Sequence, residues 1–267
     1  MFKSTRAASM RMPQVLQRLL LVAAFSGLLL PRAAFALTLT FGASDVDRVV
    51  GRVTIEVVTQ AYAQLGIDVR FERYPTKRRI LAAEQGELDG LSATFDPSIY
   101  NPQGKESKLI QLPTSIGSED FVVFTKLKKI AVNGYASLNP FVIGYVDGVR
   151  INEQRFKDMH TDVAPNQESL FRKLEAGRTD VAVDTRSGIC TARRLKLMDI
   201  VTLEPALETQ NFYHYVHKRH RDLVPKLETV LQKMKQDGSI KKIQERVELE
   251  FYAQCKCTLD ARRNCVS

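Results

Sequence analysis

The sequence lacks the short motifs that mark the common classes of enzyme active site. It contains no Gly-x-Ser-x-Gly turn for a nucleophilic serine and no His-Glu-x-x-His pair for zinc. It also has no glycine-rich loop for phosphates or dinucleotides. We therefore predict a protein that is not an enzyme and that holds neither a cofactor nor a metal ion.

Long apolar runs are also missing. The longest run, at residues 19–30, has about a dozen residues and is too short to span a bilayer. It follows a basic, acid-free start and precedes the small-x-small stretch Ala34-Phe35-Ala36. This order is typical of a secretory signal peptide over residues 1–36, cut after Ala36, and predicts a periplasmic protein that is not embedded in the membrane. No cysteine follows the cut, which argues against a lipid anchor.

The excess of positive charge is small once the leader is set aside. Residues 1–36 hold five of the 39 basic residues and no acidic one, so 34 basic residues face 30 acidic ones in the remaining 231. No basic stripe interleaved with aromatic residues occurs, and clusters such as residues 77–79 are typical of solvated faces. Nucleic acid is therefore not an expected partner. A chain of 231 residues can form one large domain or two modest ones.

Cysteine is scarce, and the redox state of the compartment to which the protein is exported decides whether these cysteines form disulfides. The four cysteines are Cys190, Cys255, Cys257 and Cys265. In an oxidising compartment disulfides are the default, and four cysteines allow three pairings that the sequence leaves open. One option pins the tail by linking Cys265 to Cys255 or Cys257. A Cys-x-Cys metal site is disfavoured because no second cysteine pair or histidine pair at zinc spacing accompanies it.

The apolar pattern alternates between strand and helix periods over residues 37–93. It predicts strands at 37–41, 67–71 and 88–93. A helix capped by Asp45 or Asp47 fills the first gap, and a second helix from Pro75 to Gly86 fills the next, with Ile80, Leu81 and Ala83 on its inner side. This order indicates two right-handed crossover units on a parallel sheet.

The second half repeats the pattern after a polar loop at 96–107. Strands are predicted at 121–125, 141–146, 181–183 and 212–216. Helices are predicted from about Asn152, from an Asn166 cap to Gly177, from an Asp222 cap through Pro225, and from Ser239. The last helix places Ile240, Ile243, Val247 and Phe251 on one apolar face.

Three stretches carry a family resemblance that covers nearly all of residues 37–251. Residues 86–90 (GELDG), 176–184 (AGRTDVAVD) and 223–243 resemble the helix ends and closing helices of the polar amino-acid class of periplasmic solute-binding proteins. These are the bacterial extracellular solute-binding proteins of family 3, which serve ABC transporters. The resemblance implies a type II periplasmic-binding fold with two α/β lobes, each a mainly parallel sheet flanked by helices, and two hinge strands. Lobe I would comprise 37–124 and 216–267 with its Cys-rich tail, and lobe II 125–215.

The resemblance places ligand contacts where strands end and helices begin, facing the cleft between the lobes. The candidates are Asp45, Arg78, Thr94, Phe95, Gly148, Arg150 and Asp184. Asp184 stands where the family often holds the ligand's ammonium group, or it caps the following turn. Asp45 is either a ligand contact or a plain helix cap. Thr94 and Phe95 offer a hydroxyl and an aromatic ring, or simply pack.

One departure from the family weighs against an α-amino-acid ligand. Amino-acid binders usually place an arginine a few residues beyond the threonine that corresponds to Thr94, because the forked guanidinium group matches the geometry of a carboxylate. Residues 96–104 contain none, which leaves Arg150 and Arg78 as substitutes or as surface charges. His214, His217 and His220 invite a metal hypothesis, but in a strand the first two point to opposite faces, so packing and exposure are expected instead.

We therefore expect a monomeric periplasmic protein that captures a small polar ligand in an interlobe cleft for ABC-type import through a membrane permease. Two alternatives remain open. The same fold serves periplasmic dehydratases that act on cyclic acids. The other is a sensor or interaction protein with a degenerate ligand site, which could present its Cys-rich tail to a membrane sensor.

Overall fold

The computed structural model describes residues 37–95, 107–126, 130–259 and 265–266. The expected leader and nearly all of the expected polar loop lie outside these ranges. Within them, no helix is both long enough and apolar enough to cross a membrane.

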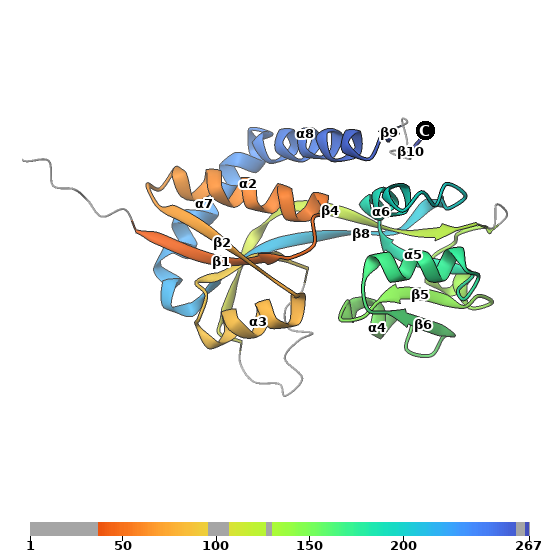
Figure 1. Ribbon diagram of the computed structural model, residues 1–267. Helices are drawn as coiled ribbons and strands as arrows, with labels where there is room; N and C mark the ends of the chain where they lie inside the picture. The colour runs from red at the N-terminus through yellow and green to blue at the C-terminus, as the bar shows by residue number, and fades with distance from the viewer. Residues whose placement is uncertain (1–36, 96–106, 127–129, 260–264, 267) are drawn as a thin grey trace, which may run out of the picture. The chain divides into compact units, whose positions relative to one another are not determined.

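One eight-stranded sheet organises the chain, in the order β2-β1-β3-β8-β4-β7-β5-β6 (Figure 1). Its strands are β1 (Thr38–Ser44), β2 (Asp68–Tyr74), β3 (Gly90–Thr94), β4 (Leu109–Thr125), β5 (Ile143–Val146), β6 (Thr161–Ala164), β7 (Val181–Thr185) and β8 (Val201–His217). β1 pairs in parallel with β2 and β3, and β5 pairs in parallel with β6 and β7. The long antiparallel strands β4 and β8 join these two parallel blocks, as expected of hinge strands.

We call the block of β1–β3 lobe I and the block of β5–β7 lobe II. Lobe I carries α2 (Val49–Ala63), α3 (Thr76–Gln85), α7 (Val224–Gln236) and α8 (Ser239–Gln254). Lobe II carries α4 (Arg150–Arg155), α5 (Gln167–Glu175) and α6 (Ile189–Arg194). The 3₁₀ segments are η2 (Tyr135–Leu138), η3 (Arg186–Gly188) and η4 (Lys218–Leu223), and β9 (Thr258–Leu259) pairs antiparallel with β10 (Cys265–Val266).

The ends of the helices agree with the glycines predicted to stop them, whereas two helix starts lack the predicted aspartate caps. Gly86 ends α3 in the left-handed conformation that glycine adopts without strain, and the Asn166 side chain accepts from the Ser169 N–H at 2.8 Å. The predicted Asp45 or Asp47 cap is wrong, because Arg48 precedes α2 in extended conformation without a capping side chain. Asp222 likewise caps nothing, since it lies inside η4.

Two of the expected strands are far longer than their apolar cores. β4 begins at Leu109 rather than Phe121, and β8 begins at Val201 rather than Phe212. The register between β4 and β8 shifts around Pro113 and Gly117, which allows the strands to continue past them. Leu81 was also placed wrongly, because 46% of it is exposed while the neighbouring Ala82 is buried.

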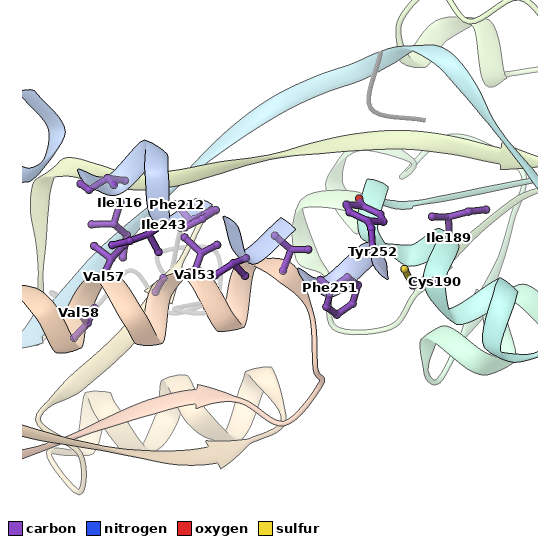
Figure 2. Close-up of a cluster of buried hydrophobic side chains, with 14 of the residues drawn as sticks. Val53, Val57, Val58, Ile116, Ile189, Cys190, Phe212, Ile243, Phe251 and Tyr252 are labelled. Atoms are coloured by element: carbon purple, nitrogen blue, oxygen red, sulfur yellow. The ribbon is translucent and has the colours of Figure 1, made fainter. Parts of the chain in front are cut away.

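The largest apolar core lies between the sheet and helices of both lobes. Figure 2 shows Val53, Val57 and Val58 of α2 beside Ile243 of α8, with Ile189 and Cys190 of α6 farther along the same cluster. A second cluster fills lobe II around Phe121, Ile143 and Phe156. The predicted face of α8, formed by Ile240, Ile243, Val247 and Phe251, is buried as expected.

The disulfide framework ties the end of α8 to lobe II. Cys190 of α6 is bonded to Cys255, with their Cα atoms 5.3 Å apart across 65 residues of sequence. Of the two tail links that the sequence left open, the one from Cys265 to Cys255 is therefore excluded. Cys257 is also disulfide-bonded, and the side chain of Cys265 lies outside the described residues.

Candidate ligand-binding site

Asp184 lies at the carboxyl end of β7, at the edge where open α/β sheets bind ligands. The residue is only 3% exposed. Its Oδ1 accepts from Arg48 Nη1 at 3.0 Å and from the Thr185 N–H at 2.8 Å. Its Oδ2 accepts from Gln167 Nε2 at 2.6 Å. Three donors therefore offset the cost of burying this carboxylate.

Arg48 reaches Asp184 from lobe I. It directly precedes α2, and its backbone is extended. The ion pair joins residues 136 positions apart and leaves 20% of the arginine side chain exposed. Asp184 thus holds a cationic group that belongs to the other lobe of the same chain.

The amide of Gln167 connects Asp184 to the start of α6. Gln167 is the first residue of α5, and its Oε1 accepts from Thr191 Oγ1 at 2.5 Å. The segment between β7 and α6 can approach this amide closely because residue 188 is glycine. A Cβ there would lie 3.2 Å from Gln167 Nε2 and 3.4 Å from Asp184 Oδ2. A side chain at position 188 would therefore press on the carboxylate and its donor.

A buried carboxylic acid lies next to this cluster on the hinge strand β4. Glu119 accepts from the Ser187 N–H at 3.4 Å. Burial and the nearby negative charge of Glu248 raise the pKa of Glu119 to about 8, so it carries a proton at neutral pH. Both residues line a polar cavity of about 30 Å³ with Val49, Ser118, Asp120, Arg186 and Tyr252. This volume suits about one water molecule rather than an organic ligand.

Arg186 of η3 connects lobe II to both hinge strands. Its guanidinium donates to Asp120 Oδ2 of β4 at 3.1 Å and forms an ion pair with Glu204 of β8. Such forked contacts between arginine and carboxylates hold backbone segments in a defined orientation. The segment after β7 is therefore anchored at the hinge as well as through Asp184.

Positive charges from both lobes gather around the segment between β1 and α2. The hydrogen bond from Arg52 chiefly lowers the pKa of Asp47, and the charges of Arg73 and Arg194 lower it further. Arg73 belongs to lobe I and Arg194 to α6 of lobe II. The field at this side of the junction is therefore shaped by arginines that the sequence analysis did not single out.

The remaining predicted residues of lobe I lie in different surroundings. Asp45 is exposed after β1, and its N–H donates to the Tyr74 carbonyl at 3.3 Å. Arg78 is exposed on α3, with its guanidinium carbon 5.1 Å from the centre of the Tyr74 ring. It lines a hollow of about 560 Å³ along that helix.

Thr94 ends β3 and Phe95 follows it, beside the hinge. Thr94 pairs with Tyr213 of β8 and is half-buried. The Phe95 ring packs against Phe121 and Phe212, with centroids 5.6 and 6.2 Å away. The aromatic ring therefore contributes to hinge packing.

Gly148 and Arg150 follow β5. Gly148 adopts a positive φ of 76°, a turn conformation that suits glycine, and its N–H donates to Glu153 Oε1 at 3.2 Å. Arg150 is the first residue of α4, and its side chain lies outside the described part of the chain. Among the described residues, the hydrogen bonds to Asp184 come from Arg48, Gln167 and Thr185, none of them a predicted site residue.

The three histidines have separate roles in lobe I. His214 is buried on β8 between Tyr62 Oη at 3.0 Å and the Ser92 carbonyl at 3.2 Å, and burial lowers its pKa to about 4. His220 contacts Asp89 at 2.5 Å. In the described ranges, no group of three or more histidine, cysteine or acidic side chains is arranged to hold a metal ion. The packing expected for His214 is confirmed.

Two parallel blocks joined by two hinge strands, with side chains from both meeting at a strand end, define a two-lobed α/β binding protein of the type II periplasmic fold. The chain belongs to the bacterial extracellular solute-binding proteins, family 3, whose model matches residues 41–248. This confirms the resemblance seen in the sequence.

The individual relatives and solved structures below share only a small part of their sequence with this chain. An uncharacterized protein of Shewanella oneidensis strain MR-1 is 26% identical over 208 residues, which cover 73% of this chain and 75% of the relative. A histidine kinase sensor domain with similarity to periplasmic binding proteins superposes with a TM-score of 0.63 at 16% identity, covering 79% of this chain and 95% of that domain. An ancestral arginine-binding protein bound to glutamine gives 0.61 at 16% identity, covering 78% and 96%.

Proposed function

We propose that the protein is a periplasmic solute-binding protein that captures a small polar ligand between its lobes and does not act as an enzyme. Its mature form begins at Leu37, with lobe I formed by residues 37–124 and 216–267 and lobe II by 125–215. The family membership and the two-block sheet support this function. The observation that carries it is the meeting of Arg48 and Asp184, which brings the two lobes together at a strand end.

Capture would follow from a difference in affinity between two arrangements of the lobes. A ligand that contacts both lobes binds the closed arrangement more tightly, and so shifts the population toward it. The hinge strands β4 and β8 would carry this movement. Delivery to a membrane permease by the monomer is the proposed use of the captured ligand.

A thermal-shift screen of polar metabolites against the mature protein tests the proposal. A ligand at about a hundred times its Kd stabilises the folded protein by about 2.7 kcal/mol. For a chain of this size, that corresponds to a Tm increase of about 5 to 10 °C. A protein whose Tm no metabolite raises, across amino acids, organic acids, sugars and polyamines, would contradict the proposed function.

A sensory role is the second candidate, favoured by the likeness to a histidine kinase sensor domain. In that role the lobes would signal to a membrane partner instead of a permease. Deletion of residues 256–267 separates the two roles and keeps the bond between Cys190 and Cys255. Ligand uptake by cells should survive the deletion if the protein serves a permease, whereas a sensor that uses the tail would lose its response.

A further inference from the structure

We propose that the interlobe site, on the function given above, takes a small anion without a cationic group, and that Arg48 is the residue that determines this specificity. The ligand chemistry is that of a carboxylate or phosphate oxygen. Three observations lead to it: the occupancy of Asp184, the unused donors of Arg48, and the charges around the junction.

The first observation is that Asp184 has little capacity left for a ligand. An ionised carboxylate offers about four acceptor positions. Arg48, Gln167 and the Thr185 N–H take three of them at 2.6 to 3.0 Å. The residue is 3% exposed, so a cationic ligand group would have to displace Arg48 to reach it.

The second observation is that Asp184 orients the Arg48 guanidinium, while most N–H donors of that guanidinium have no acceptor among the described residues. A guanidinium carries five N–H donors, and the Asp184 bond uses one nitrogen, Nη1. In the described ranges the Arg48 side chain makes no other hydrogen bond, and 20% of it is exposed. Asp184 therefore fixes the fork in place while its remaining donors stay available for a carboxylate or phosphate.

The third observation is the balance of charge around Arg48. Asp47 is already paired with Arg52 through two hydrogen bonds of 2.8 and 2.6 Å. Arg73 donates to the Ser44 carbonyl and Arg194 to a threonine hydroxyl, so both bond to neutral oxygens. Asp45 and Asp47 are both exposed, and within the described ranges Asp45 forms no ion pair. In the part of the chain that the structure describes, Arg73 and Arg194 therefore carry two positive charges that are not paired with a carboxylate, whereas Asp45 carries one unpaired negative charge. The segment is left with a surplus of positive charge, to which both lobes contribute.

The variant Asp184→Asn separates the two possible ligand charges. Its amide oxygen can keep the Arg48 and Thr185 contacts. Its amide nitrogen can donate to Gln167 after that side chain flips, because the Thr191 hydroxyl can then accept. The shape is retained while one negative charge disappears. Anion binding should therefore persist or tighten in D184N, whereas a ligand held by the carboxylate of Asp184 would be lost.

Isothermal titration of the mature protein at constant ionic strength provides the test. The probes are succinate, citrate and inorganic phosphate, against arginine and glutamine. We expect at least one anion to bind, and Arg48→Met to weaken it about ten- to a hundred-fold, the loss of one charge-assisted contact. Arg48→Lys should lie between the two. Arg172→Gln, which removes an exposed arginine paired with Glu168, is the matched control and should leave affinity unchanged.

Two results would overturn the inference. If arginine or glutamine binds, D184N abolishes that binding and R48M does not, then Asp184 holds a cation; the proposed function would stand and its ligand class would be wrong. If none of the five probes binds a protein that melts cooperatively, the anion site is refuted. The wider metabolite screen then decides the proposed function separately.

Discussion

The buried carboxyl of Glu119 makes the stability of this protein depend on pH in an uncommon direction. Its pKa is raised from 4.5 to about 8 in the folded chain, chiefly by burial and then by Glu248 and Asp120, against the opposing effects of the Ser187 N–H and Arg48. Between these two values the unfolded chain releases the proton and the folded chain keeps it. The unfolded state is therefore increasingly favoured as pH rises, by about 1.4 kcal/mol per pH unit.

The substitution Glu119→Gln removes this titration and keeps the size of the side chain. Relative to the variant, the wild-type protein should lose about 4 kcal/mol of unfolding free energy between pH 4.5 and pH 8. Well below pH 4.5 the difference between the two proteins should become constant, because Glu119 is then protonated in both states. Other titrating groups occur in both chains and cancel from the difference.

Urea unfolding of both proteins at several pH values measures this difference, provided that their m-values agree. A third variant, Glu248→Gln, should shorten the pH range of this loss, and so reduce its total without removing it, since the charge of Glu248 is a secondary cause of the shift. A wild-type protein that tracks E119Q in parallel from pH 4.5 to pH 8 would refute the assignment of a protonated acid at the hinge.

Two further perturbations test the contact between Arg48 and Asp184 and the disulfide between Cys190 and Cys255. Asp184→Ala leaves the Arg48 guanidinium and the Gln167 amide without their acceptor. We expect urea unfolding to show a loss of about 2 to 3 kcal/mol in unfolding free energy, and a much smaller loss for D184N. Replacing both Cys190 and Cys255 by serine opens a loop of 65 residues, for which chain entropy predicts a loss of about 4 kcal/mol. A double variant that melts within 1 °C of the wild type would show that the bond between α6 and α8 adds nothing.

Apolar periodicity predicted most strands and helices of the two parallel blocks, and the family resemblance predicted their two-lobed arrangement. The strands and helices of lobe I follow from the alternation in β1 and β2, and Gly86 and Gly238 stop helices where the pattern ends. The hinge strands were underestimated because their pairing is set by the partner strand and by bulges, which leave no simple period. The absent caps of α2 and α7 show that tertiary contacts decide helix starts where local side chains do not.

The candidate site was predictable only in part. Asp184 follows a buried strand, a local signal that sequence reasoning can detect. Arg48 and Gln167 carry no such signal, because their roles come from contacts across 136 and 17 residues of sequence. Glu119 sits among the polar residues of a long strand, and only its burial beside Glu248 makes it unusual. Pairing among four cysteines needed the three-dimensional structure as well.

Hydrogen exchange of the mature protein, with and without the ligand that raises its Tm most, tests the central claim directly. Capture between the lobes predicts slower exchange in two separate segments, the start of α2 after Arg48 and residues 186–190 after β7. Protection confined to one lobe, or located away from both segments, would contradict the account.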